Sequence, residues 1–250
     1  VGCKGCKREC PTGVDMARMK IEVLHRHQQD HGLTLRQRLI SYMPDYAHLA
    51  SAMAPLLNLR DTVPGLAKLT EVVLGLSASR TLPRWHRKHF FNQLPPTVDR
   101  DTVLLAKKPV VLFVDTFNGY LESEVAHAAV RVLQRGGYSV HVASRGDGGK
   151  AHLCCGRTFL ASGLVDQARA KMSELIAHVA AFAKAGIAIV GLEPSCLLTL
   201  RDEALTMDLG DDAVVVSKHA LMLEEFLLRE ANAGELDQLR QQLRPDKRTL

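Results

Sequence analysis

The sequence predicts an α/β protein in which a helical N-terminal module precedes a module built on a parallel sheet. The first part of the chain is rich in leucines at helical spacing and is interrupted by prolines. From residue 109 onward, short β-branched apolar runs alternate with amphipathic helical segments. Strands that alternate with helices are joined by right-handed crossovers into a parallel sheet. We therefore expect a domain boundary near residue 105, between domains 1–105 and 106–250.

The helical module begins with a helix predicted over residues 14–28, whose first turn contains Asp15. A long helix-favouring stretch follows over residues 33–76. Three prolines interrupt it and predict several short helices, because proline cannot continue a helix from its interior: Pro44, Pro55 and Pro64. Residues 77–106 contain Trp85 and further prolines, and we interpret them as an extended connector.

The second module has the alternation expected of a parallel sheet covered by helices. Buried parallel strands are typically short, continuous runs of apolar, often β-branched residues. The predicted strands are residues 110–114, 138–142 and 187–190. The predicted helices are residues 122–135, 164–184 and 212–230.

Composition places the chain among globular proteins that can bury a core without disulfides. It has 250 residues, of which 46% are hydrophobic and 24% charged. The formal net charge is +5, with basic residues in several stretches such as 80–89. Aromatic residues make up only 5% of the chain, so we expect no nucleic-acid partner. No apolar run reaches the roughly 18 residues that a membrane-spanning helix needs.

Three cysteines stand in the first ten residues. Cys3, Cys6 and Cys10 precede Pro11 in the pattern C-x-x-C-x-x-x-C-P. This is the latter part of the ferredoxin run whose thiolates hold iron–sulfur clusters. We predict that these cysteines bind a [4Fe–4S] cluster, with Cys10 serving a second cluster. The missing first cysteine would precede Val1, so we expect the chain to be a piece of a longer protein. Zinc binding, a redox dithiol and structural thiols remain alternatives.

A second group of cysteines follows the predicted strands. Cys154 and Cys155 come after the second strand, and Cys196 comes after the third. Sites in α/β proteins form at the carboxyl ends of strands. These thiols are therefore a candidate metal site. They are also candidates for thiol–disulfide exchange, or for small core residues with no chemical role.

These residues resemble a known family. Cys154-Cys155-Gly156 with the later Pro194-Ser195-Cys196 is similar to the cysteine-rich CCG domain, and the N-terminal run is similar to the ferredoxin-type segment that precedes it. The domain occurs in one subunit of heterodisulfide reductase, in one subunit of anaerobic glycerol-3-phosphate dehydrogenase, and in iron–sulfur subunits of lactate and glycolate oxidation. The order of segments most resembles bacterial fusions of the D-2-hydroxyglutarate dehydrogenase type.

The chain departs from the family pattern at two positions. The family has an early cysteine where this chain has Asp115-Thr116, and Glu193 replaces the first cysteine of the closing pair. The family also usually has two such repeats, and this chain has one. The resemblance therefore makes Asp115, Asn118 and Glu193 candidates for polar roles in a site that has lost ligands.

The resemblance implies the iron–sulfur electron-transfer part of an FAD-linked 2-hydroxyacid dehydrogenase or oxidase, with FAD bound elsewhere in the parent protein. The implied partners are the flavin domain of the same polypeptide or complex, and a quinone or carrier protein as electron acceptor. We expect no catalytic residue in this piece and a cytoplasmic location, with peripheral association at the inner face of the membrane left open. The alternative is a non-catalytic scaffold or interaction subunit with structural thiols or zinc.

Overall fold

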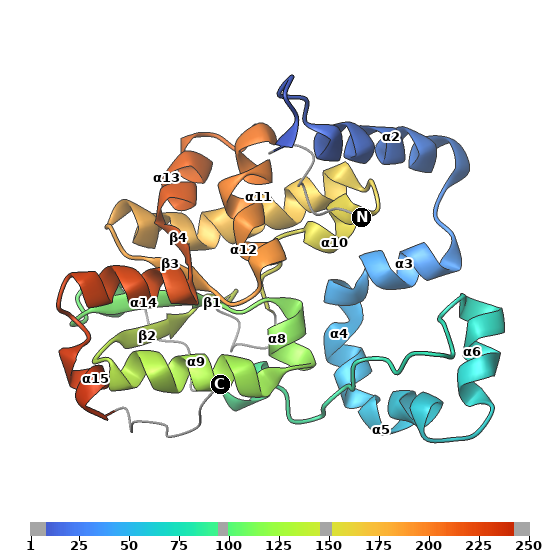
Figure 1. Cartoon of the computed structure of the whole chain (residues 1–250), viewed down its shortest axis with the longest axis horizontal. Coiled ribbons are helices and arrows are strands. Elements are labelled where there is room, and N and C mark those ends of the chain that lie inside the picture. The colour runs from blue at the N-terminus through green and yellow to red at the C-terminus, as the bar shows by residue number, and fades with distance from the viewer. Residues whose placement is uncertain (1–8, 95–99, 146–151, 243–250) are drawn as a thin grey trace. The chain divides into compact units, whose positions relative to one another are not determined.

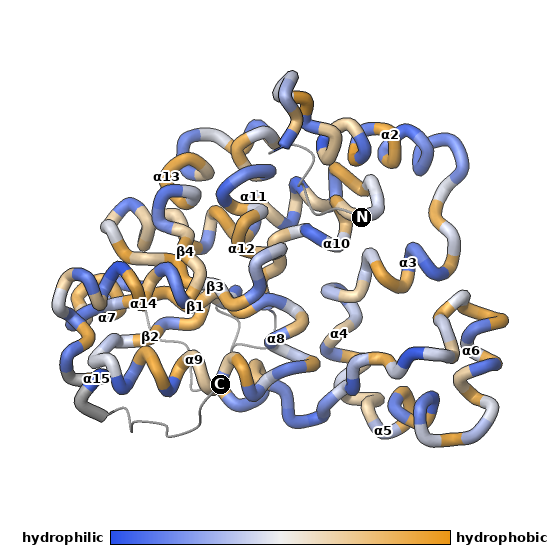
Figure 2. Tube along the Cα trace, in the orientation of Figure 1, coloured by the Kyte–Doolittle hydropathy of each residue, from blue (hydrophilic) through white to orange (hydrophobic). Residues whose placement is uncertain are grey.

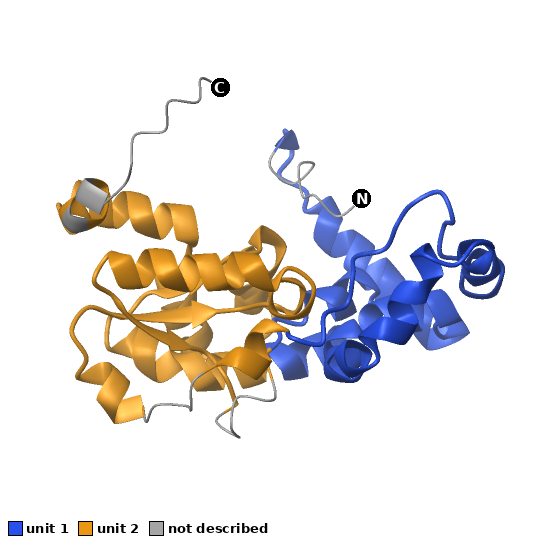
Figure 3. Ribbon diagram, turned by 90° about the horizontal axis from the view of Figure 1, so that it is seen from below, with its two compact units in different colours: residues 1–88, 154–172 blue, residues 89–153, 173–250 orange. Residues whose placement is uncertain are grey.

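The structure, a computed structural model, describes residues 9–94, 100–145 and 152–242 (Figure 1). The chain divides into two compact units (Figure 3). Unit 1 is Val1–Lys88 with Cys154–Met172, and unit 2 is His89–Leu153 with Ser173–Leu250. The domain boundary near residue 105 remains a prediction. Within the described residues, no helix has the length and apolar character needed to cross a bilayer.

Unit 1 is helical. Its elements are α2 (Met16–His31), α3 (Leu35–Ser41), α4 (Met43–Ala52), α5 (Ala54–Leu57), the 3-10 helix η1 (Asn58–Asp61), α6 (Leu66–Leu74), α10 (Arg157–Ala161) and the first part of α11 (Val165–Lys184).

Local signals in the sequence explain where these helices start. Asp15 caps α2 by accepting a hydrogen bond from the Arg18 backbone N–H, so the helix begins after Asp15, slightly later than predicted. It also ends later than predicted, at His31. Thr34 and Gln37 form a reciprocal capping box at the start of α3. Prolines occupy the first turns of α4 and α5, where a missing N–H costs nothing. The prediction of several short helices in this region is confirmed.

Segment 154–172 belongs to unit 1 through contacts with α3 and its C-cap. The Thr158 hydroxyl donates to the Ser41 carbonyl at 2.9 Å, and the Ser41 hydroxyl donates to that of Ser162 at 2.6 Å. Tyr42 and Phe159 pack edge to face, with ring centroids 5.1 Å apart. Residues more than a hundred positions apart in the sequence thus form one small core.

Unit 2 contains the sheet and the helices that flank it along the chain. Its elements are the 3-10 helix η2 (Phe90–Gln93), α7 (Arg100–Leu104), β1 (Pro109–Phe113), α8 (Thr116–Tyr120), α9 (Ser123–Arg135), β2 (Ser139–Val142), the rest of α11, β3 (Ile189–Gly191), α12 (Pro194–Arg201), the 3-10 helix η3 (Glu203–Thr206), α13 (Asp211–His219), β4 (Ala220–Met222), α14 (Leu223–Asn232) and α15 (Asp237–Gln242).

The sheet is parallel in the order β2-β1-β3-β4. Central strand β1 pairs with β2 through Leu112 and Val142, and with β3 through Leu112 and Val190. Val110, Val111 and Leu112 are fully buried, as expected for a strand covered on both faces. The α/β class and the parallel sheet are confirmed, as are the three predicted strands to within two residues at either end.

The prediction of one helix over residues 212–230 was wrong. The segment forms α13, then β4, then α14, and β4 pairs with β3 through Leu221 and Val190. Ala220 leaves the helix with ψ 114°, and its side chain is buried. Pairing with the edge of the sheet therefore overrides the helix preference of Ala, Leu and Met at this point.

Candidate functional site

The N-terminal thiol run is only partly described. Cys3 and Cys6 lie outside the described residues, whereas Cys10 is half-buried. The Cys10 Sγ lies 3.1 Å from the Thr12 Oγ1, and the Gly13 N–H donates to the Cys10 carbonyl in a tight turn. The hydrogen bond from Thr12, supported by backbone N–H groups, lowers the pKa of the Cys10 thiol. A lower pKa favours the thiolate, which is the form that binds metals.

Cys154 and Cys155 are buried thiols in unit 1. The Gly156 N–H lies 3.3 Å from the Cys154 Sγ. The hydrogen bond with Cys155 and then burial raise the pKa of Cys154 well above its usual value. The raised pKa favours the protonated form of the Cys154 thiol at neutral pH.

The backbone conformation at Gly156 explains why the C-C-G segment requires a glycine. Its φ is +78°, in the left-handed region, and a Cβ atom there would lie 2.6 Å from the Ala168 carbonyl oxygen of α11. No other residue type fits without displacing the α11 backbone. The absence of a side chain thus permits this turn to lie close to α11.

The carboxyl ends of β1 and β3 carry the two positions where the chain departs from the family pattern. From β1 the chain goes first to β2, on one side of β1, and then to β3, on the opposite side. The direction of the strand order therefore reverses between β1 and β3, which makes that position the topological switch point of the sheet. Asp115 follows β1 and Glu193 follows β3. Each is the N-cap of the next helix, α8 or α12.

Asp115 uses both carboxylate oxygens within its own turn. Oδ2 accepts from the backbone N–H groups of Phe117 at 2.8 Å and Asn118 at 3.2 Å, and Oδ1 accepts from the Asn118 side-chain amide at 2.7 Å. Burial raises its pKa, and the charge of Glu193 adds to this effect. Glu193 accepts from the Ser195 N–H at 3.2 Å. The structure thus brings Asp115 and Asn118 together, in a helix-capping arrangement.

His152 is a buried polar residue that was not among the residues expected to form a site. Its Nε2 lies 2.9 Å from the Thr116 hydroxyl and its Nδ1 lies 3.2 Å from the Tyr120 hydroxyl. The rings of Phe91 and Tyr120 pack against it. Burial raises the pKa of Tyr120 to about 12, so the phenol stays protonated. In the sequence, His152 is marked only by its position two residues before Cys154. Its partners Thr116 and Tyr120 lie more than thirty positions away, so their contact with it could not be predicted.

Cys196 lies in the first turn of α12 and is buried in unit 2, whereas Cys154 and Cys155 belong to unit 1. None of the four cysteines in the described residues forms a disulfide. Over the same residues, no group of three or more His, Cys, Asp or Glu side chains could hold a metal ion. The N-terminal run, in contrast, extends beyond the part of the chain that the structure describes.

Proteins of similar sequence are dehydrogenases or dehydrogenase subunits by name. The chain is 23% identical over 214 residues to a subunit of the anaerobic glycerol-3-phosphate dehydrogenase of Escherichia coli (strain K12), which covers 81% of the chain and 49% of the relative. It is 22% identical over 231 residues to D-2-hydroxyglutarate dehydrogenase of the same organism, covering 88% and 22%. The protein of that name from Haemophilus influenzae is 21% identical, covering 100% and 24%.

The relationship is distant. The chain spans about half the length of the first relative and less than a quarter of the other two. No family model matches the chain, and no solved structure matches it significantly. The similarity nevertheless links the chain to oxidoreductases of two kinds, one a separate subunit and the other a much longer polypeptide.

Proposed function

We propose that this chain is the iron–sulfur electron-transfer part of an FAD-dependent 2-hydroxyacid dehydrogenase or oxidase, passing electrons from the flavin to a quinone or carrier protein. The observation that carries the proposal is the cysteine run ending in Cys10-Pro11, whose one described thiol has a lowered pKa. The distant similarity to dehydrogenases supports the same interpretation.

Cys3, Cys6 and Cys10 are the proposed ligands of a [4Fe–4S] cluster. When bound, such a cluster supplies one-electron transfer at a potential set by hydrogen bonds to its sulfurs and by exposure to solvent. The Thr12 hydroxyl beside the Cys10 Sγ would be a hydrogen-bond donor of this kind to a Cys10 thiolate. The chain itself would bind no substrate, and the flavin would belong to a partner domain or subunit.

Cys154, Cys155 and Cys196 remain a second proposed metal site. Metal binding at Cys154 would require loss of a proton that its surroundings retain, and Asp115 is already engaged as a helix cap. Any metal at these thiols should therefore bind more weakly than the cluster at the N-terminal run. We propose a cytoplasmic location with peripheral association at the inner face of the membrane.

The alternative is a non-catalytic scaffold whose thiols are structural. The buried, protonated Cys154 and the tightly packed Gly156 favour this role for the C-C-G segment. It predicts a colourless protein in which the N-terminal cysteines bind zinc or no metal.

The polypeptide encoded by the gene, purified without air, distinguishes these roles. We expect iron and acid-labile sulfide in similar amounts, and visible absorption that bleaches when dithionite is added. Cys10→Ser should lower the iron content more than Cys196→Ser does, because any metal at the second proposed site should bind more weakly. Protein that lacks both iron and sulfide and carries stoichiometric zinc would support the scaffold and overturn the proposal.

A further inference from the structure

Apolar side chains are exposed along a continuous stretch of unit 1. Helix α6 has no buried residue at all, and Leu69, Val72 and Val73 are 56%, 85% and 60% exposed. These three lie at positions i, i+3 and i+4 and therefore form one stripe along the helix. The stretch that leads to it adds further exposed apolar residues: Leu49, Met53, Leu56, Leu57, Leu59 and Val63. Figure 2 shows the hydrophobic colouring along α5 and α6.

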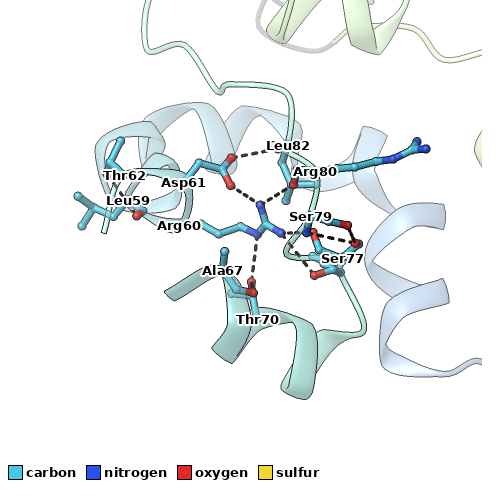
Figure 4. A network of polar contacts seen from close by, with 11 residues as sticks. Leu59, Arg60, Asp61, Thr62, Ala67, Thr70, Ser77, Ser79, Arg80 and Leu82 are labelled. Atoms are coloured by element: carbon cyan, nitrogen blue, oxygen red, sulfur yellow. Dashed lines mark hydrogen bonds and ion pairs between the residues drawn. The ribbon is translucent and has the colours of Figure 1, made fainter. Parts of the chain in front are cut away.

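A buried arginine holds α6 in place. The Arg60 guanidinium donates to the Thr70 hydroxyl of α6 at 3.0 Å and to the Ser77 carbonyl at 2.7 Å, and it pairs with Asp61 (Figure 4). Arg60 is only 6% exposed. The apolar stripe is thus displayed by a helix whose position is fixed by polar contacts. An ordered apolar face of this kind typically marks an interaction surface.

The chain after α6 runs back along η1. The Leu82 N–H donates to the Asp61 carboxylate at 3.0 Å, and Trp85 exchanges two backbone-to-side-chain hydrogen bonds with Asn58. This segment carries basic side chains that are all exposed: Arg80, Arg84, His86, Arg87 and Lys88. Positive charge therefore lies beside the apolar surface, within the same unit.

This stretch carries a net positive charge. Residues 49–88 contain six Lys or Arg and two Asp or Glu, a net +4, against +5 for all 250 residues. Residues 1–48 carry +3, and residues 89–250 carry −2. A second copy of the chain would bring two such charges together, which disfavours self-association. Nucleic acids are bound through basic groups and stacking aromatic rings, so they leave the exposed aliphatic stripe without a role.

From this juxtaposition we infer that α5, η1, α6 and residues 80–88 form a docking surface for an anionic lipid bilayer. Aliphatic side chains would enter the acyl boundary while the basic residues contact lipid headgroups, as in interfacial amphipathic segments. The inference rests on the proposed function only in its peripheral membrane association, and it locates that association on the chain. It does not depend on the cluster.

Vesicle sedimentation tests the surface. The probe is an equimolar mixture of phosphatidylcholine and phosphatidylglycerol, compared with phosphatidylcholine alone. We expect the wild type to bind only the anionic vesicles and to be released at high salt. Arg80→Gln with Arg84→Gln should weaken binding about 25-fold, because each basic residue contributes about fivefold. Val72→Ser with Val73→Ser should weaken it about tenfold or more.

Matched controls keep the test specific. Leu105 is 87% exposed in unit 2 and Lys107 is exposed beside it, so Leu105→Ser with Lys107→Gln removes similar groups elsewhere and should bind like wild type. Equal binding to neutral vesicles, no binding to either, or unchanged binding by the α6 variant each overturns the inference. If the chain forms a dimer without lipid, and the variant Val72→Ser with Val73→Ser is monomeric, the face would instead be an interface with a second copy. Iron content measured on the same samples reports separately on the proposed function.

Discussion

Two apolar runs show how differently the units use hydrophobic side chains. β1 in unit 2 is buried along nearly its whole length, with Val110, Val111 and Leu112 fully inaccessible. α6 in unit 1 is also rich in apolar residues yet buries none of them, and Arg60 fixes its position through polar contacts. β1 therefore buries its hydrophobic residues within unit 2, whereas α6 leaves an apolar stripe exposed on unit 1. Apolar composition alone therefore does not predict whether a segment is buried or exposed.

The largest expected effect comes from truncating matched leucines in the two runs. Leu112→Ala in β1 should lower the free energy of unfolding by about 2–5 kcal/mol, because it empties a fully buried site. Leu69→Ala in α6 should change it by less than about 0.5 kcal/mol, because that side chain is 56% exposed. Urea unfolding of both variants measures the difference. Similar losses at the two positions would mean that α6 is covered by other parts of the chain.

A second prediction separates the polar fixation of α6 from hydrophobic burial. Arg60→Met removes the donors to Thr70 and Ser77 and leaves their acceptor oxygens without these partners. We expect a loss of about 2–3 kcal/mol in the local stability of α6. Amide hydrogen exchange should accelerate across α6 and remain unchanged in β1.

The matched control for this variant is Arg80→Gln. Arg80 contributes only its backbone carbonyl to the Arg60 network, and its side chain is exposed. The control should leave exchange in α6 as it is in the wild type. If Arg60→Met also leaves amide exchange in α6 unchanged, hydrophobic contacts and not the guanidinium hold the helix.

The sequence was sufficient where a pattern is local. The apolar run of β1, the helical spacing of α9 and α11, and the prolines that open α4 and α5 each predicted the element observed. β4 could not be predicted, because Ala220-Leu221-Met222 becomes a strand only through pairing with β3. The parallel sheet followed from the alternation of elements, and it placed Asp115 and Glu193 at strand ends as expected.

The candidate site was harder to predict than the fold. The thiol pattern identified Cys10, whose lowered pKa depends on the neighbouring Thr12. The protonated state of Cys154 depends on burial as well as on its neighbour Cys155, and no spacing of cysteines reveals burial. The same is true of His152, whose hydroxyl partners Thr116 and Tyr120 come from another part of the chain.

The smallest expected effect is on the pH dependence of stability and comes from Asp115, at the carboxyl end of β1. Burial raises the folded-state pKa of Asp115 above the usual 3.8. Between these two pKa values the folded chain keeps a proton that the unfolded chain has lost, so stability falls as pH rises through this window. Asn at this position cannot titrate and still provides an N-cap acceptor for α8. At acidic pH, we therefore expect Asp115→Asn to change the free energy of unfolding by only a few tenths of a kcal/mol.

The measurement is the free energy of unfolding of wild type and Asp115→Asn at a series of pH values from acidic to neutral. Their difference should move in favour of the variant as pH rises, because the cost of burying a charged carboxylate is absent in Asn. Asp101→Asn is the control, since that side chain is 75% exposed. A difference that moves in favour of the wild type would mean that the Asn118 and Phe117 donors outweigh burial and hold Asp115 ionised. The carboxyl end of β1 would then hold a buried negative charge that the helix-capping donors stabilise.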